Sequence, residues 1–328
     1  MEENNIKTRV VGVDISNELT TFAIVDIRGN IIAEDNFPTT DFDNVNAFVV
    51  ALTDKVLEMV EANGGYESIR SIGISAPSAS AVAGGIVNAA NLPWKGVIPL
   101  AALVRDRLGL AVAISNDAHV SALGEKAYGS AHGMKDFIIV NIGMGLGSCF
   151  FTNGFEHQGH LGFGGEFGHT CVMPENGRKC GCGKEGCLET YVAGKGIIRT
   201  AKEVMEQNPD KPTLMSSLEK LSARTIAECC EKGDELAIEV YRRTGRMLGI
   251  GLANYASIVD PEAIILTGGI SHAGHWLIDP MKETFEEHVF HNIKGQVKIL
   301  PSILDDRTRD VLGASALAWN VPEYSLFK

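Results

Sequence analysis

Three cysteines and one histidine form the densest group of metal-binding residue types in the chain. Cys180, Cys182 and Cys187 lie within eight residues of one another, and His169 lies a short loop upstream. Three thiolates and one imidazole complete a tetrahedral structural zinc site, which leaves no open position for water. The interleaved glycines let the backbone turn tightly enough to aim three sulfurs at one point. The pattern therefore predicts a structural zinc ion held by these four residues.

Polar residues suited to binding sugar hydroxyls lie in and around the cysteine cluster. They are Glu166, His169 and Glu189. His169 has two interpretations, as a metal ligand or as a hydrogen-bonding contact to a sugar. The two are compatible, because one ring nitrogen can bind the metal while the other donates a hydrogen bond.

Asn116 and Asp117 follow an apolar segment that reads as a strand. A carboxylate at the carboxyl end of such a strand points into the crevice of an open α/β sheet. There it can accept the proton of an attacking hydroxyl, as in phosphoryl transfer. The pair Asn-Asp is also common in turns and helix caps, and these residues alone leave both interpretations open.

Three turns after strands are candidate phosphate or nucleotide loops. They are Asp14–Leu19, Gly143–Ser148 with Gly145 and Gly147, and the turn at Gly268 and Gly269. Backbone amides of such loops can cradle phosphates, although a lone glycine loop is a weak signal. The first is also compatible with an ordinary hairpin and the third with a simple tight turn.

A further loop places Asn91 close to Trp94. Amide side chains beside an aromatic ring suit carbohydrate hydroxyls, because amides both donate and accept hydrogen bonds. The alternative is a loop that packs its tryptophan into the core.

Strands and helices alternate along the chain, which predicts an α/β fold. Strands are expected over residues 10–14, 21–26, 31–36, 69–75, 111–115, 137–142, 149–152, 263–266 and 297–300, and helices over 42–62, 99–108, much of 191–256 and 310–319. A strand, a loop, a second strand and a turn occur near residue 14 and again near residue 143. This weak repeat predicts two related domains facing each other across a cleft, one of residues 1–120 joined by 308–328 and one of residues 121–307.

Bulk composition narrows the class of protein. The chain has 328 residues, 45% hydrophobic content and a net charge of −12. An acidic surface argues against nucleic-acid and anionic-membrane partners. The start Met1–Asn5 is polar and unlike a signal peptide, and no apolar run is long enough to span a bilayer. An odd number of cysteines, three of them clustered, suits a reducing compartment, so we expect a cytoplasmic protein.

Taken in order, these segments closely resemble the ROK family of repressors, open reading frames and sugar kinases, in particular its glucokinase-like members. The resemblance spans nearly the whole chain. Its most specific part is Gly165-Glu166-Phe167-Gly168-His169 followed by Cys180-Gly181-Cys182-Gly183-Lys184-Glu185-Gly186-Cys187-Leu188-Glu189. The resemblance implies a two-domain, actin-like (RNase H-like) ATPase fold with a central cleft. It also implies ATP and Mg²⁺ as cofactors, a hexose substrate and a homodimer or larger homo-oligomer.

The resemblance also implies a role for each matching residue. Asp117 is the general base, and zinc is held by His169 and the three clustered cysteines. The sugar is held by Asn91, Asn116, Asp117, Glu166, His169 and Glu189, and the nucleotide by Asp14, Gly143, Gly145, Gly147, Gly268 and Gly269. The DNA-binding domain of family repressors is not expected, because the first strand begins at Val10.

The chain departs from the family pattern on the phosphate side. The family's first phosphate loop reads Asp-x-Gly-Gly-Thr, whereas Asp14 is followed here by Ile15-Ser16-Asn17-Glu18. In the second loop Met144 replaces a threonine hydroxyl. Side chains now stand where backbone should approach phosphate, and Glu18 adds a repelling charge if it points inward. The backbone amides of Ser16 and Asn17 nevertheless remain possible phosphate donors.

Two main hypotheses follow, and they differ in catalysis. The first is an ATP-dependent kinase of glucose or a related sugar such as an N-acetylhexosamine. The second is a sugar-binding sensor or regulator with lost or weak kinase activity, because of the changes at Ser16–Glu18 and Met144. A third, a zinc-stabilised structural protein, leaves Glu166, His169 and Glu189 without a purpose.

Overall fold

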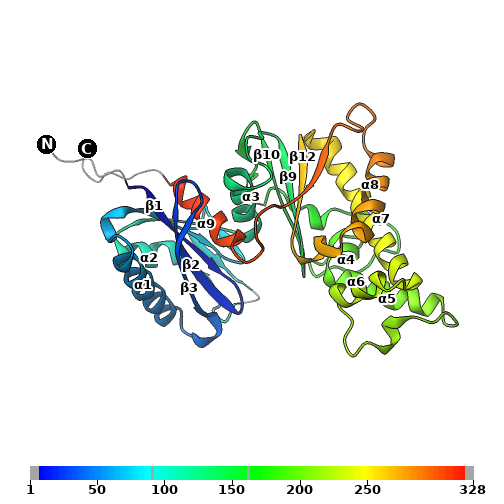
Figure 1. The fold of residues 1–328 in the computed structure, drawn as a ribbon, viewed down its shortest axis with the longest axis horizontal. Coiled ribbons are helices and arrows are strands. Elements are labelled where there is room, and N and C mark those ends of the chain that lie inside the picture. Colours follow the sequence, from blue (N-terminus) through cyan, green and yellow to red (C-terminus); the bar gives the residue numbers. More distant parts are fainter. Residues whose placement is uncertain (1–6, 90–91, 161–162, 322–328) are drawn as a thin grey trace. The chain divides into compact units, whose positions relative to one another are not determined.

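The computed structural model describes residues 7–89, 92–160 and 163–321. Within them the chain forms two compact units (Figure 1). Unit 1 holds the residues up to Gly133 and from Ile303 onward, and unit 2 holds Met134–Ser302. The boundaries expected at 120/121 and 307/308 differ from this division. The first would lie inside α3 (Asp117–Tyr128), a helix that belongs entirely to unit 1.

The two units are built on sheets of the same topology. In unit 1 the strand order is β3-β2-β1-β4-β8, and in unit 2 it is β11-β10-β9-β12-β13. In both, the first three strands pair antiparallel and the last three pair parallel. The internal repeat predicted near residues 14 and 143 is therefore confirmed at the level of the sheets.

The strands of unit 1 are β1 (Arg9–Ile15), β2 (Leu19–Asp26), β3 (Ile31–Pro38), β4 (Ile69–Ser75), β5 (Ala79–Ser80), β6 (Gly85–Val87), β7 (Val97–Ile98) and β8 (Ala111–Ser115). Its helices are α1 (Val45–Ala62), α2 (Leu100–Leu108), α3 and α9 (Arg309–Trp319). Unit 2 contains β9 (Phe137–Ile142), β10 (Leu146–Thr152), β11 (Phe155–Glu156), β12 (Ala263–Thr267) and β13 (Lys298–Pro301), with α4 (Glu189–Val192), α5 (Gly194–Gln207), α6 (Ala223–Glu231), α7 (Glu235–Val259) and α8 (His275–His288). The expected strands and helices are present, with shifts of a few residues at their ends.

The sheet of unit 1 is covered on both faces. Side chains of a strand alternate between faces, and accordingly Val11 packs in the α1–α2 core while Val10 packs against α9. The glycines of β1 and β4 let α9 lie directly on the strands. A Cβ at Gly12 would come within 2.3 Å of the Val311 carbonyl, and one at Gly73 within 2.0 Å of the Ala314 carbonyl. This close contact fixes the start of α9 beside the end of β1.

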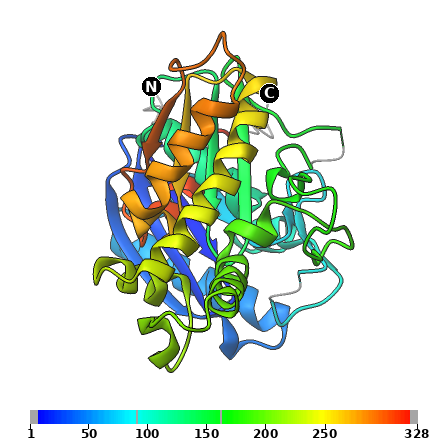
Figure 2. The same cartoon turned by 90° about the vertical axis from the view of Figure 1, so that its right-hand side faces the viewer.

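Helices α7 and α8 lie side by side in unit 2 (Figures 1 and 2). Small residues of α7 permit the close approach. A Cβ at Gly249 would meet the Met281 carbonyl at 2.5 Å, and one at Gly245 would meet that of Leu277 at 2.7 Å. Together with α5, these helices bury the apolar side chains of β9 and β12 in the core of unit 2.

Trp94 belongs to the core of unit 1. Its indole is buried, lies 4.4 Å from the Phe48 ring and donates to the Phe42 carbonyl at 2.8 Å. The interpretation of this tryptophan as a packing residue is therefore confirmed. Among the described residues, no helix combines the length and the apolar character needed to cross a bilayer.

Candidate active site and metal centre

The predicted metal ligands of unit 2 converge on one point. One ligand atom from each of His169, Cys180, Cys182 and Cys187 lies within 4.8 Å of the others. His169 Nδ1 is 3.6 Å from Cys180 Sγ, and the sulfurs of Cys182 and Cys187 are also 3.6 Å apart. Four atoms about 2.3 Å from a zinc ion would be spaced by about 3.8 Å in a tetrahedron. The observed spacing fits such an ion and is far longer than a disulfide bond.

The loop between the cysteines is shaped by hydrogen bonds and by glycine. The amide of Gly183 donates to the Cys180 carbonyl, and the Cys180 amide donates to the Lys184 carbonyl. Gly186 has a φ of +76°, and a Cβ there would meet the Met173 carbonyl at 2.0 Å. Only glycine fits this position. The glycines between the cysteines therefore allow the backbone turns that bring the sulfur atoms together.

Without a bound cation, the pKa values of the Cys187 and Cys182 thiols are shifted in opposite directions. Burial and the adjacent sulfurs raise the pKa of Cys187 to about 12. A hydrogen bond from the Lys184 backbone lowers the pKa of Cys182, which is exposed. Because zinc binds thiolates, a bound cation would supply the positive charge that the crowded sulfurs of this cluster need.

His169 uses its two ring nitrogens in two directions. While Nδ1 faces Cys180, Nε2 lies 3.9 Å from Oε2 of Glu166. Both side chains remain partly exposed. The geometry therefore allows both interpretations of this histidine at once, with Nδ1 toward a metal and Nε2 toward a polar ligand.

Glu189 reaches from the cysteine loop to the glycine loop. It begins α4 two residues after Cys187, and its Oε2 accepts a hydrogen bond of 3.1 Å from the Leu146 amide. The same oxygen lies 3.1 Å from where a Cβ on Gly145 would be. One predicted sugar residue is thus joined directly to the predicted nucleotide loop of unit 2.

The predicted nucleotide glycines lie at the same edge of the unit 2 sheet. Strands β9 and β12 are parallel, with Asn141 paired to Thr267, so the loop at Gly143 and the turn at Gly268 follow adjacent strand ends. Gly145 lies in this loop, and Gly147 lies within β10 opposite Asn141. The carboxyl edge of parallel strands is where open α/β sheets bind ligands.

The glycines of this edge fall into two physical classes. Gly268 has a φ of +85°, and a Cβ there would meet the Asn141 side chain at 2.3 Å, so the fold requires it. Gly143 and Gly269 have ordinary φ angles, and a Cβ on either would meet nothing within 4 Å. Packing therefore does not explain why these two positions lack a side chain, and their role toward a nucleotide stays a prediction.

Helix α5 starts against the same loop. The Gly194 amide donates to the Gly143 carbonyl at 2.9 Å, and no side chain caps the start of the helix. Met144 is 73% exposed beside it. A helix N-terminus next to a glycine loop favours an anion such as a phosphate.

Asn116 and Asp117 form the start of α3 in unit 1. Asn116 is the N-cap, and its Oδ1 accepts from the amides of Ala118 and His119 at 2.9 and 3.4 Å. Its interpretation as a helix cap is therefore confirmed, and its role toward a sugar stays a prediction. Asp117 is the first helical residue and remains accessible to solvent. Although the residue is exposed, protein atoms around its carboxyl partly desolvate it, and this desolvation, with the charge of Asp310 adding to the effect, raises the pKa of Asp117.

Asp14 ends β1 and has a strongly shifted acidity. Burial, followed by the charge of Asp310, raises the pKa of Asp14 to about 7. The Ser75 hydroxyl and the Arg309 guanidinium oppose this shift only in part. The Asp14 carboxyl is consequently harder to ionise than an ordinary aspartate.

Asp310 is a residue of this region that the sequence did not indicate. It lies in the first turn of α9, and burial raises its pKa while Arg309 opposes the shift. Buried Arg309 binds Asp306 at 2.6 Å and Asp310 at 3.4 Å. The only sequence signal was a carboxylate in the first helical turn, which usually means a favourable helix-dipole interaction.

The segment Asp14–Leu19, the first predicted phosphate loop, forms a closed hairpin turn. The Ser16 amide donates to the Leu19 carbonyl at 2.9 Å, and the Ser16 hydroxyl bonds the backbone of Leu19. The suggestion that the Ser16 amide is free for phosphate is therefore wrong, because the turn already uses that donor. Glu18 is exposed. Asn91, a predicted sugar residue, lies outside the described residues.

The fold and these loops indicate the structural class of the protein. Two α/β units with sheets of one topology, and loops at the strand ends, are the architecture of actin-like ATPases, as predicted. The crystal structure of a ROK family glucokinase from Streptomyces griseus in complex with glucose and AMPPNP has the same fold. It aligns with a TM-score of 0.75 at 30% identity, over 95% of this chain and 99% of that chain.

The sequence profile of the ROK family matches residues 10–321, and the chain belongs to this family. A glucokinase from Streptomyces coelicolor is 32% identical over 290 residues, which cover 84% of this chain and 86% of that protein. A xylose repressor from Caldicellulosiruptor bescii is 27% identical over 323 residues, 96% of this chain and 80% of the repressor. The predicted family and the predicted class of sugar kinase are confirmed.

Proposed function

We propose that this sugar kinase transfers the γ-phosphoryl group of ATP to a hydroxyl of a hexose, either glucose or a related sugar such as an N-acetylhexosamine. The observation that carries the proposal is Asp117, an accessible carboxylate with a raised pKa at the start of a capped helix. A carboxylate whose pKa is raised is a stronger proton acceptor, and so better matched to general base catalysis, than an ordinary carboxylate. The glucokinases among the relatives support the choice of a hexose.

Asp117 is assigned the removal of the proton from the attacking hydroxyl. The Ala118 amide donates to its Oδ1 at 2.9 Å and holds the carboxyl in place. The Asn116 cap fixes the first turn of α3. The remaining carboxylate oxygen is then oriented to accept the hydroxyl proton as the oxygen attacks phosphorus.

By the family resemblance, Mg²⁺ is assigned to Asp14 of unit 1, and the nucleotide is assigned to the glycine loops of unit 2. Mg²⁺ is commonly held by one or two carboxylates together with substrate phosphates, and Asp14 offers such a carboxylate. The open positions at Gly143 and Gly269 and the uncapped start of α5 suit a nucleotide. Bound Mg²⁺ would neutralise phosphate charge, and it would also favour the ionised form of Asp14.

Zinc is assigned a structural role at the cluster of His169, Cys180, Cys182 and Cys187. The spacing of the four ligand atoms fits a tetrahedral ion without an open position. Such an ion would fix the loop that carries Glu166, His169 and Glu189. These three residues are proposed to hold hexose hydroxyls, and the family resemblance assigns the same role to Asn91 and Asn116.

The direct test is the release of ADP from MgATP with a panel of hexoses, N-acetylhexosamines and pentoses. Sugar-dependent ADP release with at least one hexose supports the proposal. Binding of a hexose by calorimetry without any ADP release would instead favour a regulator. Neither binding nor release across the panel would reject both.

A sugar-binding sensor or regulator is the second candidate. Two specific observations favour it: the closed turn at Ser16–Leu19 and the exposed Met144 in place of a hydroxyl. Both features weaken the proposed binding of phosphate, whereas the carboxylates proposed to bind the sugar are still present. The xylose repressor among the relatives shows that regulators occur in the family.

Assembly and location are carried over as proposals from the resemblance and the cysteine pattern. We propose a cytoplasmic homodimer or larger homo-oligomer. All seven cysteines are free thiols in the structure, as a reducing compartment would keep them. Light scattering of the purified protein would test the oligomeric state.

A further inference from the structure

Unit 2 buries an arginine in the loop that leads into the cysteine cluster. Arg178 stands two residues before Cys180, and 7% of its side chain is exposed. Its main chain closes the base of the cysteine loop, because the Gly186 amide donates to the Arg178 carbonyl at 2.9 Å. A buried guanidinium is costly unless its donors are satisfied, so the groups that it bonds indicate its role.

One nitrogen of Arg178 joins helices α4 and α5. Its Nη1 donates to the Thr190 carbonyl of α4 at 2.8 Å and to the Gly196 carbonyl of α5 at 3.1 Å. The two helices meet at this point, since a Cβ on Gly196 would lie 2.6 Å from the Thr190 carbonyl. Arg178 therefore holds α4 against the first turn of α5.

The other terminal nitrogen bonds the side of α5. Nη2 of Arg178 donates to the Thr200 hydroxyl at 2.9 Å and to the Glu203 carboxylate at 2.6 Å. Arg199 also pairs with Glu203, at 2.9 Å. Burial opposes the shift, but the hydrogen bond and charge of Arg178, followed by those of Arg199, lower the pKa of Glu203. The contact between Arg178 and Glu203 is therefore an ion pair.

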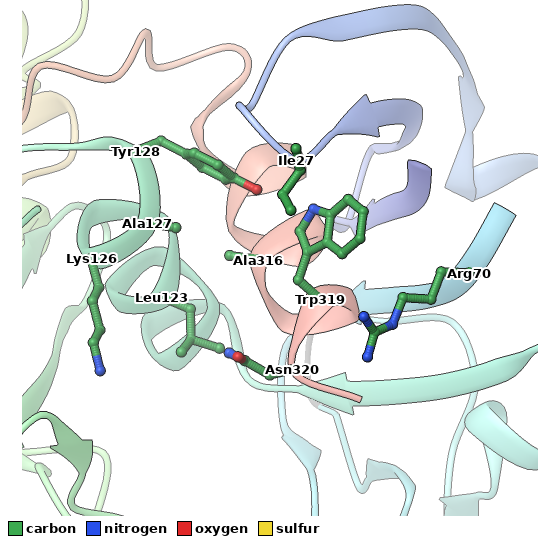
Figure 3. A pocket seen from close by; sticks show the side chains of 9 residues that line it. All are labelled: Ile27, Arg70, Leu123, Lys126, Ala127, Tyr128, Ala316, Trp319 and Asn320. Atoms are coloured by element: carbon green, nitrogen blue, oxygen red, sulfur yellow. The ribbon is translucent and has the colours of Figure 1, made fainter. Parts of the chain in front are cut away.

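The arrangement depends on the shape of the guanidinium. Its planar fork aims donors at two carbonyls, one hydroxyl and one carboxylate at once, whereas a lysine ammonium is a single point charge. Arg178 also lies 4.6 Å from the centre of the Tyr191 ring, which is a common arrangement of arginines. Arg70 of unit 1, for example, lines a pocket of about 450 Å³ between α3 and α9 and lies 5.9 Å from the centre of the Trp319 ring (Figure 3). The bonds that join two helices are therefore the part of the Arg178 arrangement that bears on a further role.

Both helices that Arg178 joins contact the glycine loop after β9. Helix α4 begins with Glu189, whose carboxylate accepts from the Leu146 amide at 3.1 Å. Helix α5 begins with Gly194, whose amide donates to the Gly143 carbonyl at 2.9 Å. The carbonyls that Arg178 bonds lie one residue after the first of these contacts and two residues after the second.

We propose that Arg178 is a positioning residue for the sugar and nucleotide site of unit 2, an inference that rests on the proposed function. Its buried guanidinium does not contact the substrates. It holds α4 and α5 together, so that Glu189 stays on the Leu146 amide and the start of α5 stays on the glycine loop. Loss of the guanidinium fork should release both contacts.

Hydrogen exchange of single amides, measured by NMR on the full chain without sugar or nucleotide, tests this directly. In Arg178→Gln and Arg178→Lys the Leu146 amide should exchange at least about tenfold faster than in the native chain, because its acceptor is no longer held in place. The rate should approach that in Glu189→Ala, which removes the acceptor.

The variants separate the fork from the charge. Arg178→Lys keeps the charge without the fork, and Arg178→Gln removes the charge while Glu203 keeps Arg199 as its partner. Arg199→Gln is the matched control, because Arg199 bonds the same carboxylate with a side chain that is 54% exposed. It should leave the exchange of Leu146 unchanged. A lysine that restored the native rate would point to a role of the charge alone.

A double variant, Arg178→Lys with Glu189→Ala, distinguishes positioning from general weakening. If Arg178 acts through Glu189, the double variant should exchange Leu146 within about twofold of Glu189→Ala alone, because both changes affect one contact. Independent effects would multiply. Calorimetry with a bound hexose should give the same pattern, with Arg178→Lys weakening the sugar Kd by at least about fivefold.

Three results would overturn the proposal. They are a native rate of Leu146 exchange in a folded Arg178 variant, an equal acceleration in Arg199→Gln, or effects that multiply in the double variant. Unchanged sugar affinity in a variant with faster exchange would reject the role toward the sugar. Thermal unfolding shows whether each variant is folded, and either Arg178 variant alone is decisive. If the native chain binds no hexose, the proposed function fails, whereas the exchange rates still decide whether Arg178 positions Glu189.

Discussion

The Glu189 carboxylate accepts a hydrogen bond of 3.1 Å from the Leu146 amide, which links the loop of the cysteine cluster to the glycine loop after β9. Only one residue separates Glu189 in sequence from Cys187, one of the four candidate metal ligands. Anything that loosens the cysteine loop should therefore also disturb the proposed nucleotide loop. A change in the predicted sugar-binding residues of unit 2 is consequently expected to affect nucleotide binding by this loop as well.

Loss of zinc should lower both stability and ligand binding. We expect Cys182→Ala to abolish about one equivalent of bound zinc, measured by elemental analysis, and to lower the melting temperature. Affinity for a non-hydrolysable ATP analogue should fall too, because Glu189 would lose its fixed position. Cys171→Ala is the control, since Cys171 is also an exposed free thiol and is not among the four clustered residues. Full zinc content in Cys182→Ala would refute the metal assignment.

The two glycines after β12 should respond oppositely to alanine. Gly269→Ala should fold normally and raise the KM for ATP several-fold, because its Cβ meets no protein atom and would enter the space proposed for the nucleotide. Gly268→Ala should instead lower the free energy of unfolding by about 1–3 kcal/mol, because of its positive φ and its clash with Asn141. Thermal unfolding and ATP titration separate the two effects. An unchanged KM in Gly269→Ala would remove that glycine from the nucleotide site.

Asp14 should make the protein less stable as the pH rises. Between its ordinary pKa of 3.8 and about 7, the folded chain binds more protons at this carboxyl than the unfolded chain does. Its contribution to the free energy of unfolding therefore falls as the pH rises through this range. In the absence of Mg²⁺, we expect Asp14→Asn to be more stable relative to the native chain at about pH 8 than at about pH 5, as measured by chemical denaturation.

Asp26→Asn is the control for this pH dependence. The Asn30 side chain lowers the pKa of Asp26, so its stabilising contribution is present above pH 3.8 and is lost as the pH falls toward the lowered value. Removing it should not reproduce the gain at high pH. A stability difference for Asp14→Asn that does not change with pH would contradict the shifted acidity of Asp14.

The altered first loop should limit the affinity for ATP. We expect the triple change Ser16→Gly, Asn17→Gly and Glu18→Thr to lower the KM for ATP or raise kcat, because it opens the Ser16–Leu19 turn and removes a carboxylate. Steady-state kinetics at saturating sugar is the measurement. Unchanged values for both constants would mean that the departures from the family pattern are harmless.

The convergence of the four candidate metal ligands could be predicted from the sequence because these residues are close in the chain. A local turn is enough to bring together Cys180, Cys182 and Cys187, and the glycines between them predict that turn. The strands and helices were likewise predictable, since their apolar periodicity is local. Asn116 and Trp94 show what residue types alone leave open, because each could serve a ligand or the fold. Both have a role in the fold, as a helix cap and as a core residue, and a sugar contact of Asn116 stays a prediction.

Relationships between distant segments were not predictable. Asp310 affects the acidity of Asp14 only because α9 returns to lie on β1, where Gly12 admits the Val311 carbonyl. Glu189 meets Leu146 through the packing of two loops, 43 positions apart. The domain boundary was also misplaced inside α3, since no composition change marks the end of unit 1. These features depend on tertiary packing, which the spacing of residues along the chain does not encode.

The most direct test of the account is the effect of Asp117→Asn on turnover and on sugar binding, measured side by side. ADP release gives kcat with the hexose found active, and calorimetry gives the Kd of that sugar. Asp106→Asn is the control, because Asp106 is an exposed carboxylate of unit 1 in α2. We predict that Asp117→Asn lowers kcat by at least about a hundredfold, the size typical of general base catalysis, while the sugar Kd changes less than about threefold. Turnover within a few-fold of the native enzyme would contradict the assignment of Asp117 as the base.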